Sequence, residues 1–244
     1  MAHHVLTDQR IFVDDYEITG DTNAVAIEYG AELKDCTVLG NDTRMNKGGL
    51  KTVQVQVSGF YDADTQDAEI FGNVGLANKP ISVAAEGGAV GDVAYFFNAV
   101  GGEYSTGESV GELNKFEMGA GAVGSLVRGV MAHNAADTAE TSTGVGDAIQ
   151  LGAVGATQRL VAVLHVLESS GSGDQTLDMV VESDDNAGFT SGLDRLTFSQ
   201  VTVSGTSQVL ELDGALVDEY YRASFTIGGT VSPSFKFVLF FGVI

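Results

Sequence analysis

The sequence predicts an all-β protein, built as a β-sandwich with one short flanking helix followed by a second β-sandwich or jelly roll. Apolar residues recur with period two far more often than at helical spacing. Glycine is abundant, with 32 of 244 residues, while proline is limited to 2. Clusters of turn residues separate the alternating runs, and regularly spaced short strands are typical of sandwiches and jelly rolls.

The clearest predicted strand covers residues 51–60. Val53, Val55 and Val57 alternate with polar residues such as Gln54, which indicates a strand with one buried face. Further strands of the first half are predicted at residues 10–13, 23–29, 81–85, 93–100, 115–119 and 125–133.

One short helix is predicted at residues 65–74. Asp64 or Thr65 can cap its start, acidic residues suit its first turn, and Ala68, Phe71 and Val74 share one face. The sequence therefore predicts a single helix that flanks the strands of the first half.

The chain is predicted to divide at residues 136–150. This stretch loses the alternation and consists of small, polar and glycine residues, as linkers do. We therefore expect one domain over residues 1–135 and a second over residues 151–244. In the second, residues 160–167 are apolar on both faces, which predicts a central strand, and residues 235–241 place large apolar side chains on one face.

The charge balance excludes several classes of function. The chain has 33 acidic and 12 basic residues, for a net charge of −21. Proteins that bind nucleic acid by neutralising phosphates need clustered Lys and Arg, and anionic membranes attract basic surfaces. No run approaches the ~18 apolar residues needed to span a bilayer, so we expect no membrane partner. The single Cys36 excludes an intrachain disulfide.

No constellation of residues points to catalysis. His165 lies in an apolar strand, where a hydrogen-bonded core histidine is the better interpretation than a metal ligand. Residues 119–124 match the spelling of a dinucleotide-binding loop, but a predicted strand follows them instead of a helix. Residues 62–69 resemble a calcium loop without its required glycine. We therefore expect no enzyme activity, no cofactor and no metal.

Residues 30–50 form a predicted loop of unusual length, and loops of this length are usually functional or disordered. The loop concentrates basic residues, with Lys34, Arg44 and Lys47 inside it and Lys51 directly after it. In so acidic a chain, a basic loop is a candidate for reaching an acidic surface on another copy. The alternative, a flexible solvated hairpin, stays open.

Several runs of the first half carry a resemblance to a known family. Residues 23–30, residues 40–44 and residues 47–61, with its alternating strand, resemble the tail tube (major tail) proteins of long-tailed bacteriophages. The later runs at residues 91–93 and 126–130 fit the same pattern. The resemblance covers roughly the first 135 residues.

The second half resembles a carboxy-terminal module that is often appended to such tail proteins, and it is similar to jelly-roll capsid cement proteins. The runs that carry this likeness lie at residues 160–167, 175–188 and 220–237. Val231 departs from the pattern and is expected to lengthen one hairpin without moving its strands.

The resemblance implies a structural virion protein of the phage tail, made in the host cytoplasm. Its subunits would form hexameric or pseudo-hexameric rings that stack into a tube together with other tail proteins, and DNA would pass through the lumen without specific binding. The long loop would join adjacent rings, residues 65–74 would form the helix, and residues 151–244 would decorate the outside. The expected ring-stacking residues are Lys34, Asp42, Arg44, Lys47 and Lys51.

Two other functions remain open from the sequence. A capsid decoration or cement protein is suggested by the second half alone. A carbohydrate-binding adhesive module is possible for a jelly roll, although exposed aromatic platforms are expected there and the chain has no Trp.

Overall fold

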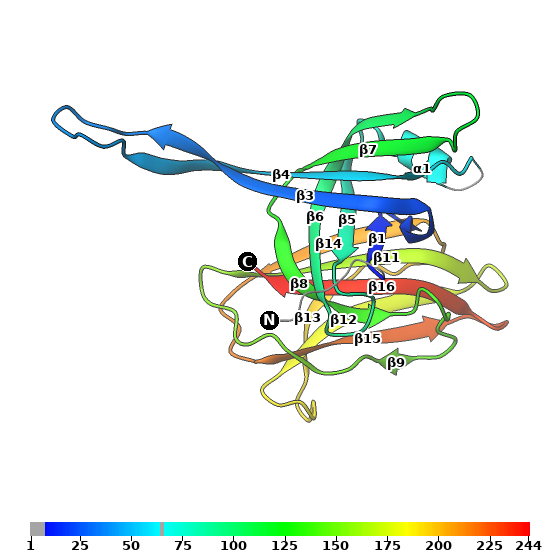
Figure 1. Cartoon of the computed structure of the whole chain (residues 1–244). Coiled ribbons are helices and arrows are strands. Elements are labelled where there is room, and N and C mark those ends of the chain that lie inside the picture. Colours follow the sequence, from blue (N-terminus) through cyan, green and yellow to red (C-terminus); the bar gives the residue numbers. More distant parts are fainter. Residues whose placement is uncertain (1–7, 64–65) are drawn as a thin grey trace. The chain divides into compact units, whose positions relative to one another are not determined.

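The computed structural model describes residues 8–63 and 66–244 (Figure 1). Strands make up 57% of it and helices 5%, which confirms the all-β prediction with one α-helix. The elements are β1 (Arg10–Val13), β2 (Tyr16–Glu17), the 3-10 turn η1 (Thr19–Asp21), β3 (Thr22–Asp35), β4 (Asn46–Phe60), α1 (Gln66–Asn73), β5 (Ala77–Ala84), β6 (Val93–Thr106), β7 (Lys115–Ala122), β8 (Val127–Asn134), β9 (Gly144–Val145), β10 (Ile149–Gln150), β11 (Arg159–Ser170), β12 (Thr176–Asp184), β13 (Leu193–Thr197), β14 (Thr206–Asp213), β15 (Tyr220–Gly228) and β16 (Ser234–Val243).

The chain forms two compact units, each assembled from separate stretches of sequence. The larger contains the residues up to Gly20, Lys79–Asn98 and Val127–Ile244, and the smaller contains Asp21–Asn78 and Ala99–Leu126. Within the predicted linker, β9 and β10 pair with β15, and Glu140 forms a bridge with Phe235. The division at residues 136–150 into two successive domains stays a prediction.

The larger unit has two antiparallel sheets with a core between them. One sheet has the order β14-β11-β16-β8-β6-β5-β1-β2, and the other has the order β10-β15-β12-β13. β11 lies between β14 and β16, so it is a central strand, as its two apolar faces predict. Alternate residues of β11 and β16, including Leu164 and Phe237, pack against Met179 of β12 and Phe225 of β15.

The opposite faces of β11 and β16 bury a second cluster. Val163 and Phe240 pack with Phe12 and Phe96, and the rings of Phe12 and Phe240 lie 5.7 Å apart. Phe12 of β1 therefore shares a core with Phe240 of β16.

His165 of β11 is fully buried beside this cluster and is hydrogen-bonded on both ring nitrogens. Nε2 lies 2.7 Å from the hydroxyl of Ser82, and Nδ1 contacts the backbone carbonyl of Asp14. Burial lowers the pKa of His165 to about 4, so the ring is neutral at pH 7. The interpretation as a hydrogen-bonded core histidine agrees with this environment.

The smaller unit contains the sheet β3-β4-β7 together with the second half of β6, and α1. Val53, Val55 and Val57 are buried on one face of β4, as their alternation predicts. Tyr104 of β6 donates a 2.6 Å hydrogen bond to Asp67 of α1, and its burial and this bond raise the pKa of Tyr104 to about 12.

The helix forms at the predicted place but buries a different face. Ala68, Phe71 and Val74 are exposed, whereas Ile70 is buried together with the polar side chains Gln66 and Asn73. Asp64 and Thr65, the two candidate caps, lie outside the described residues. Periodicity alone predicted burial of the helix face with more apolar residues. In the structure, the buried face is instead the one that begins with Gln66.

The structure also corrects the prediction of a loop over residues 30–50. β3 runs to Asp35 and β4 begins at Asn46, so only residues 36–45 connect them. These strand extensions are exposed on both faces, and a strand without a buried face has no apolar alternation to reveal it.

Candidate assembly surface

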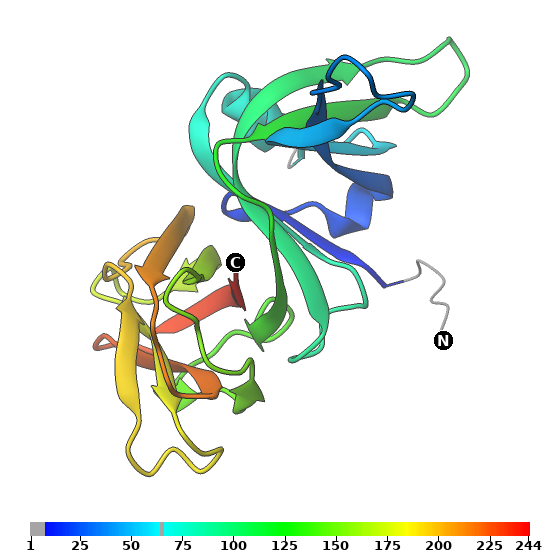
Figure 2. The same ribbon diagram turned by 90° about the vertical axis from the view of Figure 1, so that its left-hand side faces the viewer.

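The β3–β4 hairpin is much longer than the sheet that supports it. β4 pairs with β7 only from Gln54 to Phe60, so from Asn46 to Val53 it pairs with β3 alone. The unsupported part extends to the left in Figure 1, and Figure 2 views it from its tip. A two-stranded ribbon is marginally stable in water, so this part of the molecule is suited to packing against another surface.

The tip of the hairpin has its own hydrogen bonds. The Asp35 carboxylate accepts from the backbone N–H of Thr37 at 2.9 Å and from its hydroxyl at 2.6 Å, and the same hydroxyl accepts from the Met45 N–H at 2.9 Å. These bonds from Thr37 lower the pKa of Asp35. The short connection is therefore a structured turn.

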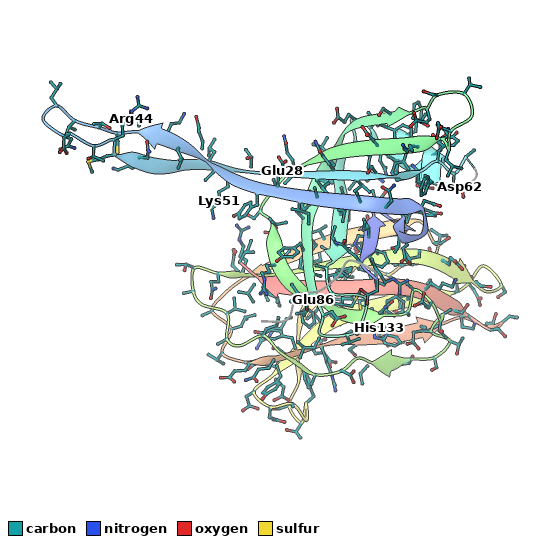
Figure 3. All side chains as sticks on the ribbon, viewed as in Figure 1. Glu28, Arg44, Lys51, Asp62, Glu86 and His133 are labelled. Atoms are coloured by element: carbon teal, nitrogen blue, oxygen red, sulfur yellow. The ribbon has the colours of Figure 1, made fainter. Side chains whose placement is uncertain are left out.

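The five residues predicted for ring stacking all lie on this hairpin, although not as one cluster. Lys34 and Lys47 are directly opposite each other in the ladder, and Asp42 and Arg44 belong to the connecting turn. Lys51 lies further from the tip, as Figure 3 shows, with its ammonium 5.7 Å from the centre of the Tyr29 ring.

The basic side chains of the hairpin differ in whether they are neutralised. Lys34 is paired with Glu32 on the same strand. Arg44 and Lys47 form no ion pair with any of the residues that the structure describes. Two cations thus remain available near the tip, beside apolar side chains in water: Leu39 is fully exposed, and Leu33 and Leu50 are largely so.

The face of the sheet opposite Val53, Val55 and Val57 is polar and bare. Residues directly across from one another form rows: Ala26, Gln56, Gly119 and Glu103 make one row, and Ala24, Ser58, Glu117 and Ser105 make the next. A hollow of about 400 Å³ opens over these rows.

Three carboxylates lie on this polar face. Glu28, Glu103 and Glu117 are exposed, and none forms an ion pair within the described part of the chain. No motif in the sequence singles them out. Alternation of apolar and polar residues around Glu28 and Glu117 could have assigned them to the exposed face of their strands. Only the pairing of β3, β4, β7 and β6 shows that the three carboxylates share one surface.

Among residues 8–63 and 66–244, this sheet has one unpaired edge along β3 and a second that is unpaired only at the end of β6. β3 pairs with β4 on one side and with no other described strand, and the end of β6, from Gly102 to Thr106, pairs with β7 alone. An unpaired edge presents rows of backbone N–H and C=O groups that can pair with another chain.

The remaining candidate chemistry of the sequence does not form a site. Across the described ranges, no group of three or more His, Cys, Asp or Glu side chains is arranged to hold a metal. The stretch that resembles a dinucleotide loop leads into strand β8. No helix within the described residues is both long and apolar enough to cross a membrane.

No protein-family model and no curated protein matches the chain. Several solved structures are similar to it. A chain in the virion of a native gene transfer agent particle is 21% identical, with a TM-score of 0.43, over 52% of this chain and 98% of that one. A chain in the tail of an empty gene transfer agent particle with C6 symmetry is 16% identical, with a TM-score of 0.39, over 48% and 94%.

A further similar structure is the Dit protein of phage SPP1, a paradigm of the hub adsorption apparatus in phages that infect Gram-positive bacteria. It is 11% identical, with a TM-score of 0.37, over 98% of this chain and 100% of that one. At these low scores, the similarities assign neither a family nor a function to the chain.

Proposed function

We propose that the chain is a structural subunit of a phage tail tube, which closes into rings through the two unpaired edges of its β3-β4-β7-β6 sheet. The observation that carries this proposal is that one face of the sheet is apolar and covered, the other is bare and acidic, and the edges along β3 and at the end of β6 are open. When β3 of one copy pairs with β6 of the next, the contact is head-to-tail, and repeated head-to-tail contacts close into a ring when the rotation permits.

The geometry of such a ring leaves room for a channel. The resemblance to tail tube proteins implies six copies or a pseudo-hexamer, and six four-stranded sheets spaced by ~4.8 Å per strand give a circumference of about 115 Å. Barrels of 16–18 strands already enclose an aqueous channel. The exposed polar face then lines the lumen, because the apolar face is occupied by the subunit's own core.

An acidic lumen suits the passage of DNA. Glu28, Glu103 and Glu117 of every copy would line the channel with carboxylates that form no ion pair with the residues that the structure describes. Like charge keeps the phosphate backbone from binding to the wall, so the genome passes without specific contacts. The same repulsion would account for a net charge of −21 in a protein that surrounds passing DNA.

The hairpin would join one ring to the next, with Lys34, Asp42, Arg44, Lys47 and Lys51 as the ring-stacking residues. Its unsupported length and exposed apolar side chains favour a partner outside the subunit. On this proposal the protein has no enzymatic role, and it resides in the virion beside other tail proteins.

Electron microscopy of the purified protein tests the proposal. Negative staining should reveal hollow cylinders, and deletion of residues 36–48 should leave single rings, whose presence shows that the variant still folds. If the full-length protein stays monomeric at high concentration, the proposal fails. If it forms trimers that bind expanded capsid shells but never stack, it is instead a cement protein.

A further inference from the structure

The smaller unit has an exposed connection at each end of β4. The hairpin tip, residues 35–47, is at one end. At the other end, β4 finishes at Phe60, opposite Lys115, and the backbone N–H of Tyr61 donates to the Asn114 carbonyl at 3.1 Å. The β6–β7 connection, residues 107–114, is therefore at the end remote from the tip. Figure 3 shows the same separation for Arg44 and Asp62, which lie toward opposite ends of β4.

The β6–β7 connection is acidic, whereas the tip carries the unpaired cations Arg44 and Lys47 together with two carboxylates, Asp35 and Asp42. The connection contains Glu108 and Glu112 and no basic residue. Glu108 is neutralised by Lys115 at 3.0 Å, but Glu112 forms no ion pair with any described residue. The unpaired carboxylate at one end thus matches the unpaired cations Arg44 and Lys47 at the other.

The two ends also match in their apolar side chains. Val110 is fully exposed and Leu113 is 70% exposed in the connection, while Leu39 is fully exposed in the tip. Large apolar side chains so exposed at the same place as an unpaired charge are typical of interaction surfaces.

From this complementarity we infer that the hairpin tip of one copy docks on the β6–β7 connection of the next copy along the tube. Arg44 and Lys47 pair with Glu112, and Leu39 packs against Val110 and Leu113. The inference rests on the proposed function and specifies the receiving surface. Contact between opposite ends of β4 is head-to-tail and repeats indefinitely, whereas a contact between two tips would join only two copies.

Zero-length carbodiimide cross-linking of the unmodified protein tests the docking directly, because it joins an amine only to a carboxylate in contact with it. The 15-residue strand β4 separates the two ends by about 50 Å, so a link between Lys47 and Glu112 can form only between copies. We expect this link in tubes and its absence from the full-length protein kept unassembled by dilution. Tubes in which Lys47 links only to other carboxylates overturn the inference and leave the proposed function standing.

Charge reversal provides a second test. Arg44→Glu with Lys47→Glu, or Glu112→Lys alone, should shorten tubes by about tenfold or more while rings persist, and combining all three changes should restore length. Arg128→Glu and Asp194→Lys are the controls, since both residues are exposed in the larger unit and neither forms an ion pair. Unaltered tube length in both reversals overturns the inference. A full-length protein that forms no rings overturns it together with the proposed function.

Discussion

Lys34 and Lys47 are directly opposite each other near the end of the β3–β4 ladder. Like charges at facing positions of antiparallel strands repel, and Lys34 alone has a carboxylate neighbour, Glu32. In a chain of net charge −21, two facing cations are a local exception. Lys47 thus carries a positive charge that no described carboxylate neutralises. It lies near the end of the hairpin, where another molecule can neutralise it.

Lys47→Glu should affect the subunit and the assembly in opposite directions. It replaces repulsion with an attractive pair and should stabilise the hairpin by up to about 1 kcal/mol. Hydrogen exchange of the β3 and β4 amides should slow in the isolated subunit. Tube formation should weaken at the same time, measured by light scattering and microscopy. A variant whose tubes grow as fast as those of the wild type would contradict the assembly role of Lys47.

His165 should make the larger unit sensitive to acid. Its folded pKa is about 4, below the ordinary 6.5, so the unfolded chain binds a proton that the folded chain excludes. The stabilisation is complete above about pH 6.5 and is lost as pH falls toward 4, a change of about 3 kcal/mol.

Denaturant unfolding between pH 7 and 4.5 measures this dependence. Asp14, whose carbonyl contacts His165, also forms an ion pair with Lys79. His165→Gln removes the titrating ring and leaves this ion pair in place, so the stability of the variant should be lower at pH 7 but should fall less steeply with acid. Equal pH slopes in the two proteins would show that His165 does not titrate in this window.

Gly59 should be intolerant of any side chain. A Cβ there would lie 1.9 Å from the Asp21 carbonyl oxygen and 2.7 Å from the Phe116 ring, so backbone would have to move. Gly59→Ala should cost about 1–3 kcal/mol or more of unfolding free energy. Gly48→Ala is the matched control on the same strand, because nothing lies within 4 Å of its Cβ. Similar melting temperatures for the two variants would contradict the argument.

Reversing the charge of the polar face should convert a passive wall into one that binds DNA. Tubes of the combined variant Glu28→Lys, Glu103→Lys, Glu117→Lys should retain a short DNA duplex, with affinity that falls steeply as salt rises. Wild-type tubes should not retain it at any salt. Fluorescence anisotropy measures both. Retention equal to wild type would show that these side chains do not face the channel.

Truncation after residue 139 should leave an insoluble fragment. The shortened chain would lose β11 and β16, leaving Phe12 and Phe96 without Val163 and Phe240. Aggregation on expression is expected, and Phe240→Ala in the full chain should cost about 3–5 kcal/mol. A soluble, cooperatively unfolding fragment of residues 1–139 would instead support the predicted division of the chain at residues 136–150.

The amount that sequence patterns could predict differed between elements for physical reasons. β4 near Val55 was evident because one buried face imposes alternation, and β11 and the end of β16 because two buried faces impose a continuous apolar run. The outer part of the hairpin was predicted as a loop because neither of its faces is buried. The helix was predicted at the right place, but its buried face was not, since that face contains the polar residues Gln66 and Asn73.

By itself, the sequence determined the all-β class, the acidic balance and the concentration of basic residues around one connection, because these depend on composition and short-range periodicity. Only the tertiary structure decided that Glu28, Glu103 and Glu117 share a face, that Lys34 opposes Lys47, and that Arg44 and Glu112 lie at opposite ends of one sheet. These relationships depend on which strands pair and in which register. Such pairing joins residues far apart in the chain, so no local pattern encodes it.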